Sequence, residues 1–162
     1  MFLSDDHRAV NEVLQQLRKA LDDKDVQAAY VKLDLLWARL AVHIRAEHLH
    51  LFPAVAARLR AAESVIEPLR SDHDFFMREL ARAIGVLRDY GELTAVAETV
   101  REIENRLITH NEIEETQVYR WADTILTEPE QIELARRVKR ELEKRPPRFS
   151  LETWRNLDSS VL

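Results

Sequence analysis

The chain has 162 residues, 46% of them hydrophobic and 33% charged, with a net charge of −5, a balance ordinary for a globular protein of one domain or one domain with a tail. It contains no cysteine, which excludes disulfides, thiolate zinc sites and cysteine-held iron–sulfur clusters and fits a reducing compartment. No basic face stands out in the sequence, so we expect no nucleic-acid partner. The start, MFLSDDHR, lacks a signal pattern, and no apolar run approaches the roughly 20 residues that span a bilayer, so we expect a cytoplasmic protein with no membrane partner.

The first half of the chain predicts two long helices. Ser4 can cap the first helix, whose apolar residues recur at helical spacing until the DDKD of residues 22–25 ends it. A second helix should run from about Val26 to Pro53, and the proline should kink or end it. Residues 54–62 can then add a turn or two.

The second half predicts a similar pair and one shorter helix. Pro68 suits the first turn of a third helix that ends near Gly91, and a fourth helix spans roughly residues 92–127. A fifth helix should follow Pro129 and stop at Pro146. Its inner side is expected to carry Ile132, Ala135, Val138 and Leu142.

Short connections between four long helices favour antiparallel neighbours. We therefore predict an all-α protein, an up-down-up-down antiparallel four-helix bundle over residues 1–127. Residues 128–162 are expected to form an additional C-terminal helix and a tail, including Trp154, that pack on the bundle or on a partner.

Each of the four long helices carries one histidine on its apolar stripe, and all four should point into the bundle. These histidines are His7, His43, His73 and His110. The members of each helical pair lie at similar distances from the turn that joins their helices, so we expect all four at similar heights. The first and third of them each follow an aspartate, Asp6 or Asp72.

The other two histidines of this set begin a repeated motif. HIRAEHLHLFP starts at His43 and HNEIEETQVYR at His110, and both read His, three residues, Glu, three residues, an aliphatic and an aromatic. Histidine and glutamate four apart share a helix face, a carboxylate can bridge two cations, and imidazole suits transition metals. Four histidines with Glu47 and Glu114 at one level predict a dinuclear metal site, which also explains carboxylates on apolar stripes.

Each feature alone has a simpler explanation. A single histidine on an apolar stripe is more often a hydrogen-bonded core residue, and one His-x-x-x-Glu is often a surface pair. His48 lies off the face of His43 and Glu47, so we expect it to be solvated. His50 lies seven residues after His43, and a role for it at the site or its rim stays open.

Together these residues resemble the hemerythrin-like, or HHE cation-binding, family over roughly residues 5–125, including the LFP after the second-helix motif. The resemblance implies a non-haem centre of two iron ions, joined by oxo or hydroxo groups. It implies as terminal ligands His7, His43, His73 and His110, and as bridges Glu47 and Glu114. Asp6 and Asp72 would hydrogen-bond to ligands or favour the helix starts.

The chain also departs from the oxygen-carrying hemerythrins. Met77 stands where they have a third-helix histidine, and Glu114 follows His110 by four residues where they have an aspartate five later. A thioether is a poor ligand for ferric iron. The resemblance therefore implies a more open centre that binds or reacts with O2, NO or peroxide in stress response or sensing, and it leaves open whether the protein is an enzyme.

Two other functions fit the sequence. The first is an iron- or oxygen-responsive regulatory module that acts on a protein partner, or forms a homodimer, through residues 128–162. The second is iron storage or donation without small-molecule chemistry.

Overall fold

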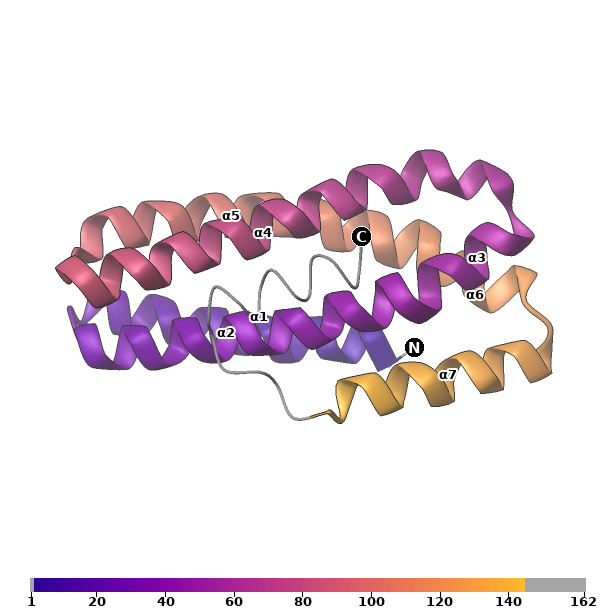
Figure 1. Ribbon diagram of the computed structural model, residues 1–162, viewed down its shortest axis with the longest axis horizontal. Helices are drawn as coiled ribbons and strands as arrows, with labels where there is room; N and C mark the ends of the chain where they lie inside the picture. Colours follow the sequence, from indigo (N-terminus) through magenta and orange to yellow (C-terminus); the bar gives the residue numbers. More distant parts are fainter. Residues whose placement is uncertain (1, 145–162) are drawn as a thin grey trace.

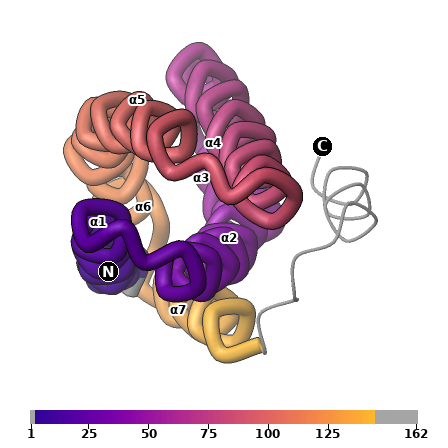
Figure 2. Tube along the Cα trace, turned by 90° about the vertical axis from the view of Figure 1, so that its left-hand side faces the viewer, coloured from indigo at the N-terminus to yellow at the C-terminus, as the bar shows by residue number. Residues whose placement is uncertain are grey.

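The computed structural model describes residues 2–144, and all regular structure in this range is helical. Four long helices form an antiparallel up-down-up-down bundle, as predicted (Figures 1 and 2). They are α1 (Phe2–Asp22), α2 (Val26–Ala46), α4 (Glu63–Tyr90) and α5 (Leu93–Ile113). No helix within this range is long and apolar enough to cross a membrane.

Two of the long helices continue through a wider turn. α2 passes into a π-helical turn, η1 (Glu47–Leu51), and then α3 (Phe52–Arg58), while α5 passes into η3 (Glu114–Val118) and then α6 (Tyr119–Ile125). The Phe52 N–H donates to the Glu47 carbonyl, five residues back, and the Tyr119 N–H donates to the Glu114 carbonyl in the same way. Each π turn therefore begins at the glutamate of the repeated motif, and such turns often mark functional sites.

Two predicted boundaries are wrong because buried side chains extend the helices. Ser4 lies inside α1 and does not cap it, since the helix starts at Phe2 and buries Leu3 completely. α4 begins five residues before Pro68, after a 3-10 turn at Arg60–Ala62, and buries Ile66 completely. After Pro53 the chain adds a short helix and a 3-10 turn, as expected, because the missing N–H of the proline falls at the start of α3 after the π turn.

Two predicted boundaries are confirmed. The Asp25 side chain accepts a hydrogen bond from the Ala28 N–H at 3.0 Å and caps α2. Gly91, with φ of 63°, ends α4 in the left-handed region that glycine adopts without strain.

The bundle interior consists of two apolar clusters with a polar layer between them. The first cluster lies toward the α1–α2 and α4–α5 turns and includes Leu17, Leu33, Trp37, Phe76, Leu80 and Ile84. The second lies toward α3, α6 and the last helix and includes Leu3, Phe52, Ile66, Leu69, Val118 and Val138. Because apolar side chains cover the polar layer from both ends, water cannot reach it along the bundle axis.

The last described helix, α7 (Glu128–Leu142), packs across α2 and η1 (Figure 2). Thr127 and Glu130 form a capping box at its start, so the predicted fifth helix is confirmed. Its inner side matches the prediction in part: Val138 is buried and Leu142 packs against the second cluster, but Leu134 is also buried while Ile132 is 56% exposed. The expected stop at Pro146 and the Trp154 tail lie outside the described residues.

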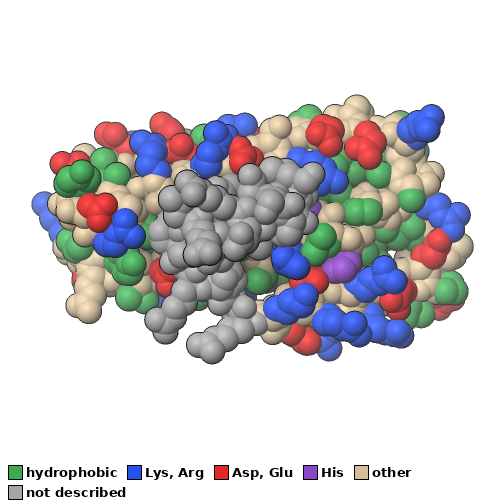
Figure 3. All heavy atoms as spheres, viewed as in Figure 1, with side chains coloured by type: hydrophobic (Ala, Val, Ile, Leu, Met, Phe, Trp, Pro, Cys, Tyr) green, Lys and Arg blue, Asp and Glu red, His purple; other side chains and the backbone are tan. Residues whose placement is uncertain are grey.

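Basic side chains gather over α7 on the face shown in Figure 3. Acidic residues of the same helix pair with them: Glu133 lies 3.0 Å from Arg136 and 2.8 Å from Arg137. This surface therefore mixes both charges.

Candidate metal centre

The polar layer brings together six side chains from all four long helices. They are His7, His43, Glu47, His73, His110 and Glu114, and each is at most 5% exposed. α1 and α4 each contribute one histidine, and the repeated motifs on α2–η1 and α5–η3 contribute a histidine and a glutamate each. The structure thus places every side chain of the predicted metal-ligand set in one buried layer.

The imidazoles meet in two pairs through their inner nitrogens. His7 Nε2 lies 3.1 Å from His43 Nε2, and His73 Nε2 lies 3.0 Å from His110 Nε2. Two nitrogen ligands that bind one ion at about 2.1 Å, at right angles to each other, are about 3 Å apart. Each pair therefore has the separation that one shared cation requires.

The two carboxylates lie between these nitrogen pairs. Glu114 reaches both, with Oε2 at 3.1 Å from His7 Nε2 and Oε1 at 2.8 Å from His110 Nε2. Glu47 places Oε1 at 3.2 Å from His43 Nε2 and 3.3 Å from His73 Nε2. Either carboxylate can thus contact two cations, one at each histidine pair.

Aspartates orient two of the imidazoles. The Nδ1 of His43 donates to Asp6 Oδ2 at 2.8 Å, and the Nδ1 of His110 donates to Asp72 Oδ2 at 3.1 Å. Each aspartate serves the histidine of the neighbouring helix rather than the one beside it in sequence. Because the proton sits on Nδ1, Nε2 can direct a lone pair into the layer.

The other two imidazoles are oriented by residues that the sequence analysis missed or misplaced. His7 Nδ1 lies 2.9 Å from Glu115 Oε1, and His73 Nδ1 lies 2.7 Å from His48 Nε2. The prediction that His48 is solvated is wrong, since it is 5% exposed. α4 and α7 both pack against α2, so this helix has no wide solvent face. Each of these partners, Glu115 and His48, directly follows the glutamate of a repeated motif. An alignment of the two motifs would have shown that they occupy equivalent positions.

Tyr119 is a further member of the site that sequence reasoning missed. Its hydroxyl donates to Glu47 Oε2 at 2.9 Å and lies 3.2 Å from Glu114 Oε2 and 3.1 Å from His7 Nε2. Its counterpart in the other motif, Phe52, stacks on the His73 ring at a centroid distance of 5.9 Å. The π turn brings the aromatic residue that lies five positions after each glutamate to the inner face. The aromatic residue repeated in both motifs was therefore the signal by which Tyr119 could have been found.

Two remaining candidates lie beside the layer rather than in it. The sequence left open whether His50 belongs to the site. His50 Nε2 lies 3.2 Å from Glu141 Oε1, so this histidine contacts α7. Met77 is 1% exposed and belongs to the first apolar cluster.

Burial and charge act against each other at this site. Burial opposes protonation of His110, but Glu114 and the hydrogen bond to Asp72 outweigh it and raise the pKa of His110 to about 9. Burial likewise opposes a charge on His43, yet the Glu47 carboxylate raises its pKa well above the ordinary value. Burial and the Glu114 charge oppose ionisation of Glu47, but the adjacent imidazoles lower its pKa to about 2. In the metal-free protein, protons on the imidazoles can therefore neutralise the negative charges of the two carboxylates.

The donor set fits a transition-metal pair. Glu47 Oε1 is buried and accepts no hydrogen bond of good geometry, although two imidazole nitrogens lie near it. A buried carboxylate oxygen without a donor is costly unless a cation contacts it. Imidazole nitrogen and carboxylate oxygen are together the ligands of first-row transition metals. The two groups of three residues that could each hold an ion, one at each histidine pair, share Glu114.

Comparison with known proteins agrees with this geometry. The family model described as hemerythrin HHE cation binding domain matches residues 2–122. No curated protein and no solved structure matches the chain.

Proposed function

The chain belongs to the hemerythrin HHE cation-binding domain family, and we propose that it is a non-haem di-iron protein that binds or reacts with O2, NO or peroxide. One observation carries the proposal: two pairs of imidazole nitrogens, at 3.1 and 3.0 Å, face each other across two shared carboxylates. Histidines with only a structural role, on the surface or in the core, would have no reason to point their nitrogens at one another in this way.

His7 and His43 would hold one iron, His73 and His110 the other, and the two glutamates would be shared. Two nitrogens and two carboxylate oxygens occupy about four positions at each ion, which suits an iron site with open positions for small ligands. Structural zinc sites are instead closed and tetrahedral. When bound, two reduced irons supply two electrons, which with two protons convert a peroxide to water and a second hydroxyl compound.

The chain's own residues support this chemistry in three ways. The apolar clusters on both sides exclude water and strengthen electrostatic interactions inside. The outer hydrogen bonds of the four imidazoles fix their orientation. Burial and the charges of Glu114 and Glu47 raise the pKa of Tyr119 well above its ordinary value, so its Oη keeps its proton and can turn that single donor from Glu47 Oε2 to a small ligand bound beside it.

Rapid-mixing spectroscopy of the reduced, iron-loaded protein with O2, NO and hydrogen peroxide tests this function. We expect NO to bind, peroxide and O2 to oxidise the iron, and no long-lived oxygenated state. An oxygen adduct stable for hours and released intact under vacuum would instead establish oxygen carriage. The cysteine-free sequence agrees with a reducing compartment, so we propose the cytoplasm as its location.

A regulatory module is the second candidate, and one contact favours it. Glu141 of α7 is 6% exposed and contacts His50, which lies in the same π turn as Glu47. A change at the metal layer can thus reach α7, and we propose residues 128–162 as the part of the chain that binds a partner and residues 1–127 as the metal-binding bundle. Hydrogen exchange of α7 with and without iron tests this candidate, which requires α7 amides to exchange at different rates in the two forms.

A further inference from the structure

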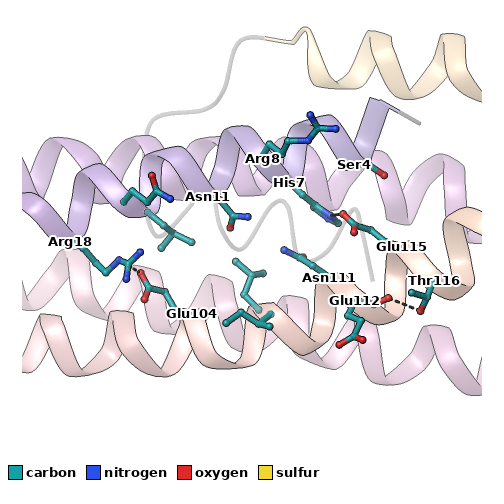
Figure 4. A pocket seen from close by; sticks show the side chains of 14 residues that line it. Ser4, His7, Arg8, Asn11, Arg18, Glu104, Asn111, Glu112, Glu115 and Thr116 are labelled. Atoms are coloured by element: carbon teal, nitrogen blue, oxygen red, sulfur yellow. Dashed lines mark hydrogen bonds and ion pairs between the residues drawn. The ribbon is translucent and has the colours of Figure 1, made fainter.

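A groove of about 690 Å³ lies between α1 and α5 and reaches the metal layer (Figure 4). His7 is part of its lining, so a candidate ligand borders the groove directly. A second hollow of about 770 Å³ on another face is lined by Arg70, Arg78 and Arg106, and it touches His48 but none of the six candidate ligands. The α1–α5 groove is therefore the better route to the centre.

Hydrogen-bonding groups line the groove where it meets the metal layer. Glu115 accepts from His7 Nδ1 at 2.9 Å while its side chain stays 45% exposed, so its carboxylate faces the groove at the end that borders the layer. Asn11 and Asn111 project from the facing helices beside it (Figure 4). This end suits a head group that can both donate and accept hydrogen bonds.

The wall beyond these groups is apolar. Leu14 and Leu107 are each 4% exposed and form its floor, and Ile108 beside them is 69% exposed. At the far end, Arg18 and Glu104 pair at 3.1 Å, so neither charge is left to attract a charged ligand. An apolar wall next to a polar end fits an organic molecule with a polar head.

Size and charge narrow the class of ligand. Hydrogen peroxide and diatomic gases are only slightly larger than a water molecule, whose share of liquid volume is about 30 Å³, so they need no groove of about 690 Å³. Arg8 also lines this end, but it pairs with Asp5 at 3.1 Å. The Glu115 carboxylate repels anions and accepts a hydrogen bond from a neutral O–OH group.

We propose that this groove binds an organic hydroperoxide. Its O–OH head lies at His7 and Glu115, and its carbon body lies against Leu14, Leu107 and Ile108. The inference rests on the proposed function, in which the centre reacts with peroxides, and it adds the substrate class.

Cumyl alcohol tests the groove without any reaction, because it is cumene hydroperoxide with a hydroxyl in place of O–OH. Equilibrium dialysis against the full, iron-loaded chain should show binding. The variant Ile108→Glu should weaken it about tenfold or more, because a carboxylate beside the carbon body must lose water. Ile132→Glu is the matched control, since Ile132 is also exposed, at 56%, and lies on α7 outside the groove.

The reaction rates provide a second measurement. We expect Ile108→Glu to slow iron oxidation by cumene hydroperoxide about tenfold relative to the Ile132→Glu control. Failure of wild-type protein to bind cumyl alcohol, or equal losses for Ile108→Glu and Ile132→Glu, would overturn the groove proposal. Failure of hydrogen peroxide to oxidise the iron would overturn peroxide reactivity instead, so the two failures are distinguishable.

Discussion

The metal layer has two halves, one with His7, His43 and Glu47 and the other with His73, His110 and Glu114. The two halves have the same arrangement of ligands and differ at two neighbouring positions. In each half a carboxylate of the neighbouring helix orients the motif histidine, and a π turn starts at the motif glutamate. The residue after that glutamate differs, His48 in one motif and Glu115 in the other. The aromatic four positions further on differs as well, Phe52 against Tyr119. The repeated residues are those that a metal pair needs, and the changed ones surround it.

The changed residues give the two histidine pairs different surroundings. His7 has the charged, half-exposed Glu115 at its outer nitrogen and the Tyr119 hydroxyl near its inner one. His73 has the buried imidazole of His48 at its outer nitrogen and the Phe52 ring stacked against it. We therefore expect small ligands to bind on the His7 side, where a hydroxyl and a groove are present, and the His73 side to stay closed.

The largest expected effect comes from a residue that both halves share. Glu114 contacts both nitrogen pairs, so Glu114→Ala should reduce iron from two ions per chain to less than one, measured by metal analysis after gel filtration. Glu112→Ala is the control, because Glu112 is exposed one half-turn away. Retention of two irons in Glu114→Ala would show that the halves bind metal independently.

Removal of the metal should destabilise both halves together. A ligand present at about 1,000 times its Kd adds about 4 kcal/mol to folding, which corresponds to roughly 10 °C in Tm for a chain of this size. Calorimetry with and without a chelator measures the shift. An identical Tm in both conditions would contradict metal binding in the core.

The pH dependence of the metal-free protein should follow the raised pKa of His110. A pKa of about 9 in the folded state, against about 6.5 unfolded, gives stability that is fully present below pH 6.5. It is lost as pH rises through about 9. Urea unfolding of the chelated protein from pH 6 to 10 should show this loss, and iron-loaded protein should lack it, because the metal replaces the proton. Parallel curves for both forms would refute the exchange of metal for protons.

A smaller effect should separate the two halves. Glu115→Gln removes a carboxylate that polarises His7, and His48→Gln replaces the imidazole partner of His73 with an amide. We expect Glu115→Gln to lower iron affinity about tenfold and His48→Gln to lower it less, in competition with a chelator. A larger loss of iron affinity in His48→Gln than in Glu115→Gln would mean that the Glu115 carboxylate is not what makes the two halves different.

Tyr119→Phe should have the smallest effect on metal and a specific one on ligands. It gives both halves the same aromatic residue and removes one donor from Glu47, at a cost of about 1–2 kcal/mol in stability. Two irons should remain, while the spectrum of the NO complex should change. Tyr90→Phe is the control, since Tyr90 is 76% exposed. An unchanged NO spectrum would place the ligand away from Tyr119.

Helical periodicity predicted that the six candidate side chains meet in one layer, because α1, α4 and the helices up to each motif glutamate are regular. Beyond that glutamate the π turn changes the register, so His48 and Tyr119 could not be placed by a period of 3.6 residues. Burial of His48 also depends on packing of α4 and α7 against α2, as does the orientation that leaves Ile132 exposed. Such contacts between distant segments leave no local pattern in the sequence.

The central claim is that the two halves hold one coupled iron pair. Mössbauer spectroscopy and magnetic susceptibility of protein loaded with iron-57, combined with iron and protein determination, test it most directly. We predict two ferric ions per chain that are antiferromagnetically coupled, because Glu47 and Glu114 both lie between the two histidine pairs. One iron per chain, or two irons that show no magnetic coupling, would contradict it.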